Sequence, residues 1–148
     1  MQLSDHFSLE EMIASEYATR NHLNNTPPPD VEDKLKITCA NLEKVRAVLL
    51  RPLIISSGYR SPELNRAIGG AKDSAHVLGY AADFICPRFG TPKEIAEKLI
   101  KPENSLKFDQ IIMEGTWVHI SFDPRLRGQV MTAQFSSGAP TMYSLGIS

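Results

Sequence analysis

The chain has 148 residues, of which 42% are hydrophobic and 22% are charged, and its formal net charge is −1. This length and composition are those of a globular protein with one core, so we expect residues 1–148 to form a single domain. The charge gives no electrostatic basis for binding nucleic acid or a membrane surface, and no apolar stretch is long enough for us to expect insertion into a membrane.

The first third of the chain predicts helices. Ser-Leu-Glu-Glu at 8–11 is a capping box that begins a short helix. The three prolines within 24–30 predict a loop there. From 31 to about 50, apolar residues recur at helical spacing, which predicts a long amphipathic helix.

A strand and a loop follow this helix. Leu-Ile-Ile-Ser at 53–56 predicts a strand that leads into the loop carrying Arg60. Ser61 and Pro62 then begin a short helix, and the glycines at 69–70 end it.

The segment from His76 to Asp83 predicts a bend followed by a strand. On one continuous helix these two residues would lie roughly 10 Å apart along the axis, too far to share one metal ion. Gly79 tolerates the conformation that a bend requires, and the apolar run at 80–86 is typical of a buried strand. An aspartate inside such a strand is costly to bury unless it is paired or bound to a metal.

The next segments predict a helix and a hairpin. Thr-Pro-Lys-Glu at 91–94 is a second capping box. The runs at 108–114 and 117–122 both read as strands, and Gly115-Thr116 between them predicts a two-residue hairpin turn.

This turn sets the positions of Glu114 and His119. With a two-residue loop, Ile112 pairs with His119 and Glu114 pairs with Trp117, and these four side chains share one face of the hairpin. Glu114 then lies diagonally across from His119, within reach of a long side chain. A carboxylate at that position suits the general base of a hydrolase, provided that the turn has this length.

The C-terminal segment predicts one more strand. Residues 129–135 suit an edge strand, and the Ser/Gly/Pro-rich segment 136–148 is expected to be a loosely ordered tail. We therefore expect an α+β fold with its core at about 7–135. It would have a small, mainly antiparallel sheet with helices packed on one side and a metal site on the open face.

The residues His76, Asp83 and His119 offer two imidazoles and a carboxylate. Such a set can hold one zinc ion and leave a coordination position open, as catalytic zinc sites do. Structural zinc sites close the fourth position, usually with thiolates, and the chain has only Cys39 and Cys86. We therefore expect one catalytic Zn²⁺ per chain.

Four motifs together resemble the zinc D-alanyl-D-alanine carboxypeptidase family, whose fold is shared with the hedgehog signalling domain and which includes phage peptidoglycan endopeptidases. They are Ser-Gly-Tyr-Arg-Ser-Pro-Glu-Leu-Asn (57–65), Ile-Gly-Gly (68–70), Ser-Ala-His-Val-Leu-Gly-Tyr-Ala-Ala-Asp-Phe (74–84) and Trp-Val-His-Ile-Ser-Phe (117–122). The resemblance implies that His76, Asp83 and His119 bind zinc. It also implies that Arg60 and Ser74 contact a carbonyl or carboxylate of the substrate.

The chain departs from several relatives near the last histidine. These carry an acidic residue three positions before it or a histidine two positions before it, where this chain has Thr116 and Trp117. Glu114 is then the best candidate for the catalytic base. Trp117, the only tryptophan, suits either a packing anchor or a wall of the substrate groove.

We expect a monomeric hydrolase of the peptidoglycan stem peptide, specifically an L-alanyl-D-glutamate endopeptidase of the phage lysis type. A D-alanyl-D-alanine carboxypeptidase and a non-catalytic zinc-binding module are the alternatives. The N-terminus lacks the basic start and apolar run of a signal peptide. We therefore expect cytoplasmic synthesis, with action on the cell wall after release or from a phage particle.

Overall fold

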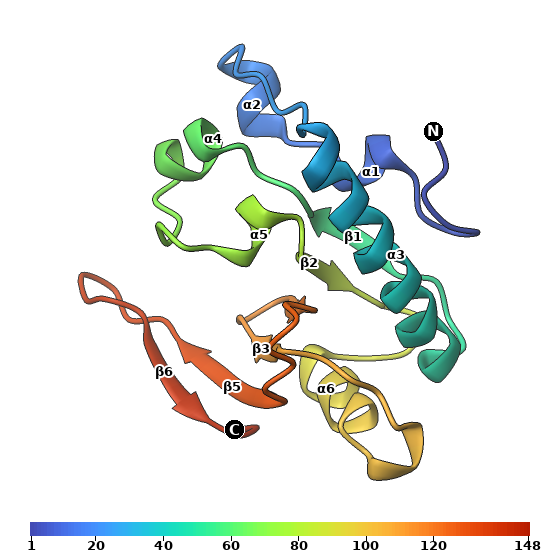
Figure 1. Ribbon diagram of the computed structural model, residues 1–148. Coiled ribbons are helices and arrows are strands. Elements are labelled where there is room, and N and C mark those ends of the chain that lie inside the picture. The colour runs from blue at the N-terminus through green and yellow to red at the C-terminus, as the bar shows by residue number, and fades with distance from the viewer.

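A computed structural model describes residues 1–148, which form helices and one mixed six-stranded sheet (Figure 1). The strands are β1 (Ile54–Ser57), β2 (Ala81–Ile85), β3 (Gln110–Met113), β4 (Val118–Ser121), β5 (Gln129–Gln134) and β6 (Met142–Leu145). The helices are α1 (Leu9–Ile13), α2 (Glu16–Arg20), α3 (Pro29–Leu49), α4 (Pro62–Ala67), α5 (Ala75–Leu78), α6 (Pro92–Leu99) and the 3-10 turn η1 (Pro102–Asn104). No helix combines the length and the apolar character that crossing a membrane demands.

The core lies between one face of the sheet and the helices α3 and α6. Strands β2, β4 and β3 are antiparallel neighbours, and their alternate residues point to opposite faces. On the inner face, these strands contribute six residues to the main buried apolar cluster: Ala82, Phe84, Ile111, Met113, Val118 and Ile120. Asp83 and His119 alternate with these residues and do not belong to the cluster, so they lie on the opposite, open face.

The expected α+β class and mainly antiparallel sheet are confirmed. The strand order is β1-β2-β4-β3-β5-β6, and only the β3–β5 pair is parallel. The register of the hairpin is confirmed as well, because Ile112 pairs with His119 and the Glu114 amide donates to the Trp117 carbonyl at 3.0 Å. Glu114 therefore lies beside His119, as the two-residue turn requires.

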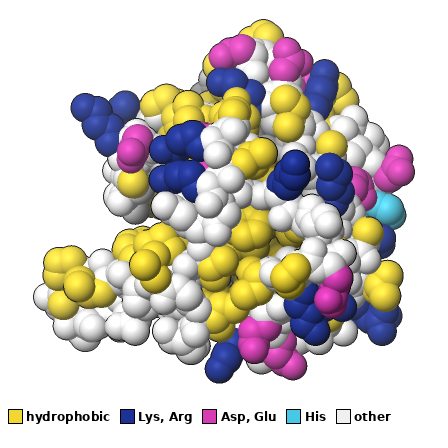
Figure 2. Space-filling model, turned by 60° about the horizontal axis from the view of Figure 1, so that its bottom comes forward, with side chains coloured by type: hydrophobic (Ala, Val, Ile, Leu, Met, Phe, Trp, Pro, Cys, Tyr) yellow, Lys and Arg dark blue, Asp and Glu magenta, His cyan; other side chains and the backbone are white.

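The C-terminal segment differs from the expectation. Strand β5 is not at the edge of the sheet, because it lies between β3 and β6. The tail expected to be loose contains β6, which pairs with β5, and the Ser/Gly/Pro-rich residues 136–141 connect the two strands. Composition that favours a turn is also the composition of a disordered tail, so the sequence pattern did not separate the two. The hairpin projects from the rest of the molecule and carries apolar side chains, at the lower left in Figure 2.

The bend expected between His76 and Asp83 occurs at Gly79. This residue ends α5 with φ of +84°, in the left-handed region that favours glycine. Its carbonyl accepts a buried hydrogen bond of 2.7 Å from the Thr38 hydroxyl on α3. A Cβ at this position would lie 3.0 Å from Cγ1 of Val31. The bend is therefore held against α3, and a larger residue at this position would crowd Val31.

We expect Gly79→Ala to destabilise the protein more than Gly69→Ala, the matched control. Both glycines have a positive φ, but a Cβ on Gly69 would meet nothing within 4 Å. Both variants carry the left-handed strain of about 1–2 kcal/mol, and only Gly79→Ala adds crowding, of roughly 1–3 kcal/mol. The free energies of unfolding in urea measure the difference. Equal losses in the two variants would contradict the account of the bend.

Candidate metal centre

Asp83 stands at the centre of the open face. It lies in β2 between Ser57 of β1 and His119 of β4, and it is only 6% exposed. A buried carboxylate without partners would cost several kcal/mol. The surrounding residues must therefore supply positive charge or hydrogen-bond donors.

His76 provides one partner from α5, which approaches the open face and not the helical layer. Its Nδ1 lies 2.7 Å from the carbonyl oxygen of Gly58. Because a carbonyl only accepts, Nδ1 carries the proton, and Nε2 keeps its lone pair. This Nε2 is buried without a hydrogen-bond partner, 3.3 Å from Oδ1 of Asp83. A buried ring nitrogen with a free lone pair beside a carboxylate is the donor arrangement that a metal ligand requires.

The Gly58 carbonyl is itself held in place by a close approach to α1. The amide of Tyr59 donates to the Met12 carbonyl at 2.7 Å. A Cβ on Gly58 would lie 2.3 Å from that same oxygen. The glycine of the Ser-Gly-Tyr-Arg motif therefore allows the loop to approach α1 and orient the His76 ring.

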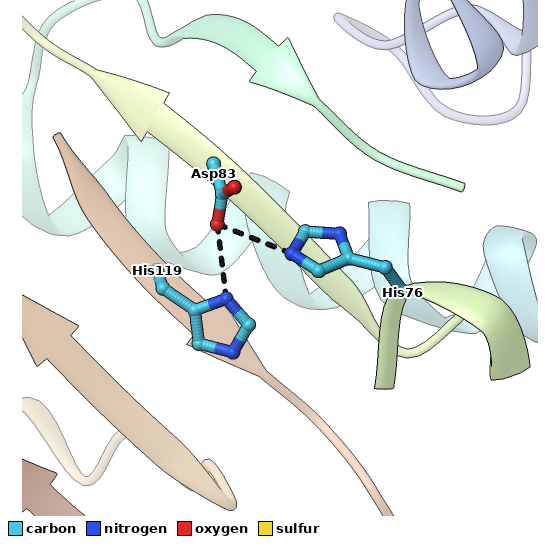
Figure 3. A group of neighbouring side chains, drawn as sticks. All are labelled: His76, Asp83 and His119. Carbon is cyan, nitrogen blue, oxygen red and sulfur yellow. Dashed lines mark hydrogen bonds and ion pairs between the residues drawn. The ribbon is translucent and has the colours of Figure 1, made fainter. Parts of the chain in front are cut away.

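His119 completes the group from β4 (Figure 3). Its Nδ1 lies 2.9 Å from Oδ1 of Asp83, and the two imidazole rings are 5.0 Å apart. The three ligand atoms all lie within 4.8 Å of one another. Ligands of a tetrahedral zinc ion, with bonds of about 2 Å, lie roughly 3.3 Å apart. The group can therefore hold one metal ion, and its donor types suit zinc.

The same contacts determine the charge states of the group. Burial disfavours the Asp83 carboxylate, but the nearby imidazoles of His76 and His119 outweigh this effect and hold the pKa of Asp83 well below its usual range. Burial lowers the pKa of His76, against the attraction of Asp83. An ionised aspartate beside a neutral imidazole is the protonation state that a metal requires of its ligands.

Arg60 lies beside this group in the loop after β1. Its Nη2 is 3.9 Å from Oδ2 of Asp83, and its Nη1 donates to Oδ1 of Asn65 at 2.9 Å. Its Nε is buried without a partner. The guanidinium is thus fixed by α4 beside the ligand group, and the residue lines a cleft across the open face.

Glu114 approaches from the hairpin turn. Its Oε1 lies 3.6 Å from Nδ1 of His119. Burial raises the pKa of the Glu114 carboxyl; His119 and Arg60 oppose this shift, and Asp83 adds to it. A carboxyl with a raised pKa accepts and returns a proton more readily near neutral pH.

The cleft across the open face has a volume of about 520 Å³, and its lining includes Arg60, His76, Glu114 and His119. The lining also includes Ser74, Asp109, Arg125, Arg127, Met131 and Tyr143. Ser74 lines the cleft and also caps α5, where its hydroxyl accepts from the His76 amide at 3.2 Å. Trp117 is not among the lining residues, and its half-buried ring suits the packing alternative.

The sequence analysis missed one wall of the cleft. Arg125, Arg127, Met131 and Tyr143 all follow the last motif and lie on the loop after β4 or on the C-terminal hairpin. Asp109, directly before β3, accepts two hydrogen bonds from the Arg127 guanidinium. The sequence feature that could have indicated this wall is the charged turn Asp-Pro-Arg-Leu-Arg at 123–127.

A comparison with protein-family models places the chain in a known family. Residues 5–121 match the family model described as Peptidase M15, which covers well over half of the chain. The matched segment contains His76, Asp83 and His119 and ends at the last residue of β4. A search of curated proteins found no match.

We expect Asp83→Asn to abolish stabilisation by zinc. A ligand at 100 times its Kd stabilises a folded protein by about 2.7 kcal/mol, which should raise the Tm of the wild type by several degrees. Asp83→Asn removes the central charge and should show no shift. Asp73→Asn is the control, because Asp73 lines the same cleft outside the ligand group. Thermal unfolding with and without zinc measures the effect, and an unchanged shift in Asp83→Asn would exclude this site.

Asp109 should stabilise the fold in a pH-dependent manner. Its hydrogen bonds with Arg127 hold the pKa of Asp109 below its ordinary value, against the effect of burial. Its contribution is therefore complete above the unfolded pKa of about 3.9 and is lost as the pH falls through the folded value. At pH 7, Asp109→Asn should lower the free energy of unfolding by roughly 1–3 kcal/mol. This difference in unfolding free energy between the wild type and Asp109→Asn, the deficit, should shrink below about pH 4.

Urea unfolding at neutral and acidic pH measures this deficit. The exposed Asp5→Asn is the control and should be nearly neutral throughout. A deficit for Asp109→Asn that does not change with pH would contradict the assignment.

Proposed function

Because the chain belongs to the peptidase M15 family of zinc-dependent peptidases that act on peptidoglycan, we propose that it is an L-alanyl-D-glutamate endopeptidase of the stem peptide. The observation that carries this proposal is the cleft, which continues past the ligand group along the open face as far as Arg125 and Tyr143. A cleft of that extent suits a chain that is cut internally.

His76, Asp83 and His119 would hold the zinc ion in this reaction. When bound, zinc polarises a carbonyl and lowers the pKa of water toward about 7. The residues supply the rest of the chemistry. His76 keeps its Nε2 lone pair because Gly58 accepts the Nδ1 proton, and Asp83 stays ionised between the two imidazoles.

Glu114 would move the protons. Its Oε1 would take a proton from the attacking water and later deliver it to the nitrogen of the leaving amine. Arg60 would donate to the carbonyl oxygen as negative charge develops there, which requires a guanidinium that is already positioned. Ser74 would contact the substrate backbone from the start of α5. Trp117 would support the hairpin behind Glu114 more than it touches the substrate.

One observation favours a second candidate, a D-alanyl-D-alanine carboxypeptidase. Arg60 offers a buried cation beside the ligand group, and such a cation suits a terminal carboxylate. The placement of Glu114 near His119 argues against a non-catalytic module, which would have no use for a carboxylate there. In either catalytic case we propose that the enzyme acts on the wall as a monomer, after release from the cell or as part of a phage particle.

Mass spectrometry of the fragments released from purified peptidoglycan distinguishes these reactions. Cleavage between L-alanine and D-glutamate that stops when a chelator removes the metal is the expected result. Loss of only the terminal D-alanine would support the carboxypeptidase in its place. No release by the zinc-loaded protein would overturn both proposals.

We expect Glu114→Gln to retain zinc and to lose turnover by about 10²–10⁴-fold, which is the usual contribution of a general acid–base group. The glutamine keeps the shape of the side chain but neither takes nor returns the proton. Glu103→Gln, on η1, is the matched control and should retain full activity. Metal content and kcat are measured for both variants. Full activity of Glu114→Gln would refute the role of this residue as base.

A further inference from the structure

One end of the cleft is lined by residues that lie outside the family match. The matched segment stops at residue 121, and the loop that follows β4 places Arg125 and Arg127 in the cleft lining. These arginines therefore lie outside the matched segment, whereas the ligand group lies inside it. Their arrangement indicates what they bind.

Arg127 is held rigidly by a buried carboxylate. Its Nε donates to Oδ1 of Asp109 at 2.9 Å, and its Nη2 donates to Oδ2 at 2.8 Å. Asp109 is only 1% exposed, whereas the Arg127 side chain is 34% exposed. This bidentate contact leaves Nη1 without a partner in the protein, so the guanidinium is positioned and still has donors to offer.

The guanidinium of Arg125, two residues earlier, is held by a single hydrogen bond, and the side chain is 62% exposed. Its Nε donates to Oδ1 of Asp123 at 3.0 Å, and its Nη2 lies 3.9 Å from Oδ2 of Asp109. Between the two arginines, Leu126 has φ of +41°, an unusual conformation for a residue with a side chain. Strain of this kind persists where the surrounding contacts enforce it, often at ligand sites. The turn thus presents both guanidiniums to one end of the cleft.

The distance from the ligand group follows from the strand register. Ile112 pairs with His119, and Asp109 lies three residues earlier on the same chain segment. Three residues of strand span roughly 10 Å. An extended peptide with its scissile bond at the ligand group would therefore present its next two or three residues to the arginines.

We propose that Arg125 and Arg127 form a subsite that binds a free carboxylate of the stem peptide. The inference rests on the proposed endopeptidase function. The first residue of the stem is joined to the sugar through its amine and to D-glutamate through its carboxyl, so every free carboxylate lies on the D-glutamate side of the scissile bond. The subsite therefore orients the substrate with that side toward Arg125 and Arg127, and it favours walls in which these carboxylates are not amidated.

Calorimetry with the zinc-loaded protein tests the subsite directly. The probes are the dipeptide γ-D-glutamyl-L-lysine and its two mono-amides, one on the D-glutamate α-carboxyl and one on the lysine carboxyl. One amide should bind about 10–100-fold more weakly than the diacid, which is the range expected for a lost charge-assisted hydrogen bond. The amide that loses affinity identifies which carboxylate is bound.

The matched variants are Arg125→Gln, Arg127→Gln and, as the control, Arg20→Gln on the distant helix α2. Arg125→Gln leaves the Asp109–Arg127 contact intact, so its result does not depend on the stability of that pair. Both cleft variants should reduce the ratio of diacid affinity to amide affinity at least several-fold, and the control should keep the wild-type ratio. Three results would overturn the subsite. The first is equal affinity of the wild type for the diacid and both amides, and the second is a Kd of the wild type for the diacid above about 1 mM. The third is a ratio of diacid to amide affinity that stays unchanged in both cleft variants.

Hydrolysis of a peptide that contains the L-alanyl-D-glutamate bond is measured in parallel. If the wild type binds the diacid more tightly than one amide but does not hydrolyse the peptide, the endopeptidase proposal is contradicted and the subsite stands. If it hydrolyses the peptide but binds the diacid and the amides equally, only the subsite is contradicted.

Discussion

The buried carboxylate of Asp83 is the constraint on which the rest of the structure depends. It lies in a central strand, where an isolated charge would cost several kcal/mol. His76, His119 and Arg60 converge on it from three other segments of the chain. Each of these segments has a visible reason for its course: the bend at Gly79, the register of the β3–β4 hairpin, and the close approach of the Gly58 loop to α1. These local conformations bring side chains from segments that are far apart in sequence together at Asp83.

The cleft divides into two parts with different physical roles. Near Asp83, short contacts between buried side chains keep the Asp83 carboxylate ionised and fix the His76 tautomer. Fixed protonation states of this kind suit a reaction at a single bond. At the other end, Arg125 and Arg127 are more exposed, and aspartates fix them without using all their donors. This second end belongs to the segment after residue 121, beyond the family match.

Much of the reaction centre was predictable from sequence because it depends on local rules. A glycine between His76 and Asp83 implies a bend, and a two-residue turn sets Glu114 beside His119. The C-terminal wall was not predictable in the same way. The pairing of β5 with β3 is parallel and joins segments separated by the whole of β4, which short-range patterns do not encode. Strand β6 follows a turn whose composition also suits disorder, and the Asp109–Arg127 contact is visible only once β3 and the loop after β4 are adjacent.

X-ray absorption at the zinc edge of the reconstituted wild type tests the central claim most directly. If Asp83 and the two imidazoles form an open catalytic site, the protein binds one zinc ion per chain. The spectrum should then show only nitrogen and oxygen ligands, at about 2.0–2.1 Å. Sulfur ligands at about 2.3 Å, or a zinc content far below one per chain after reconstitution, would contradict the account.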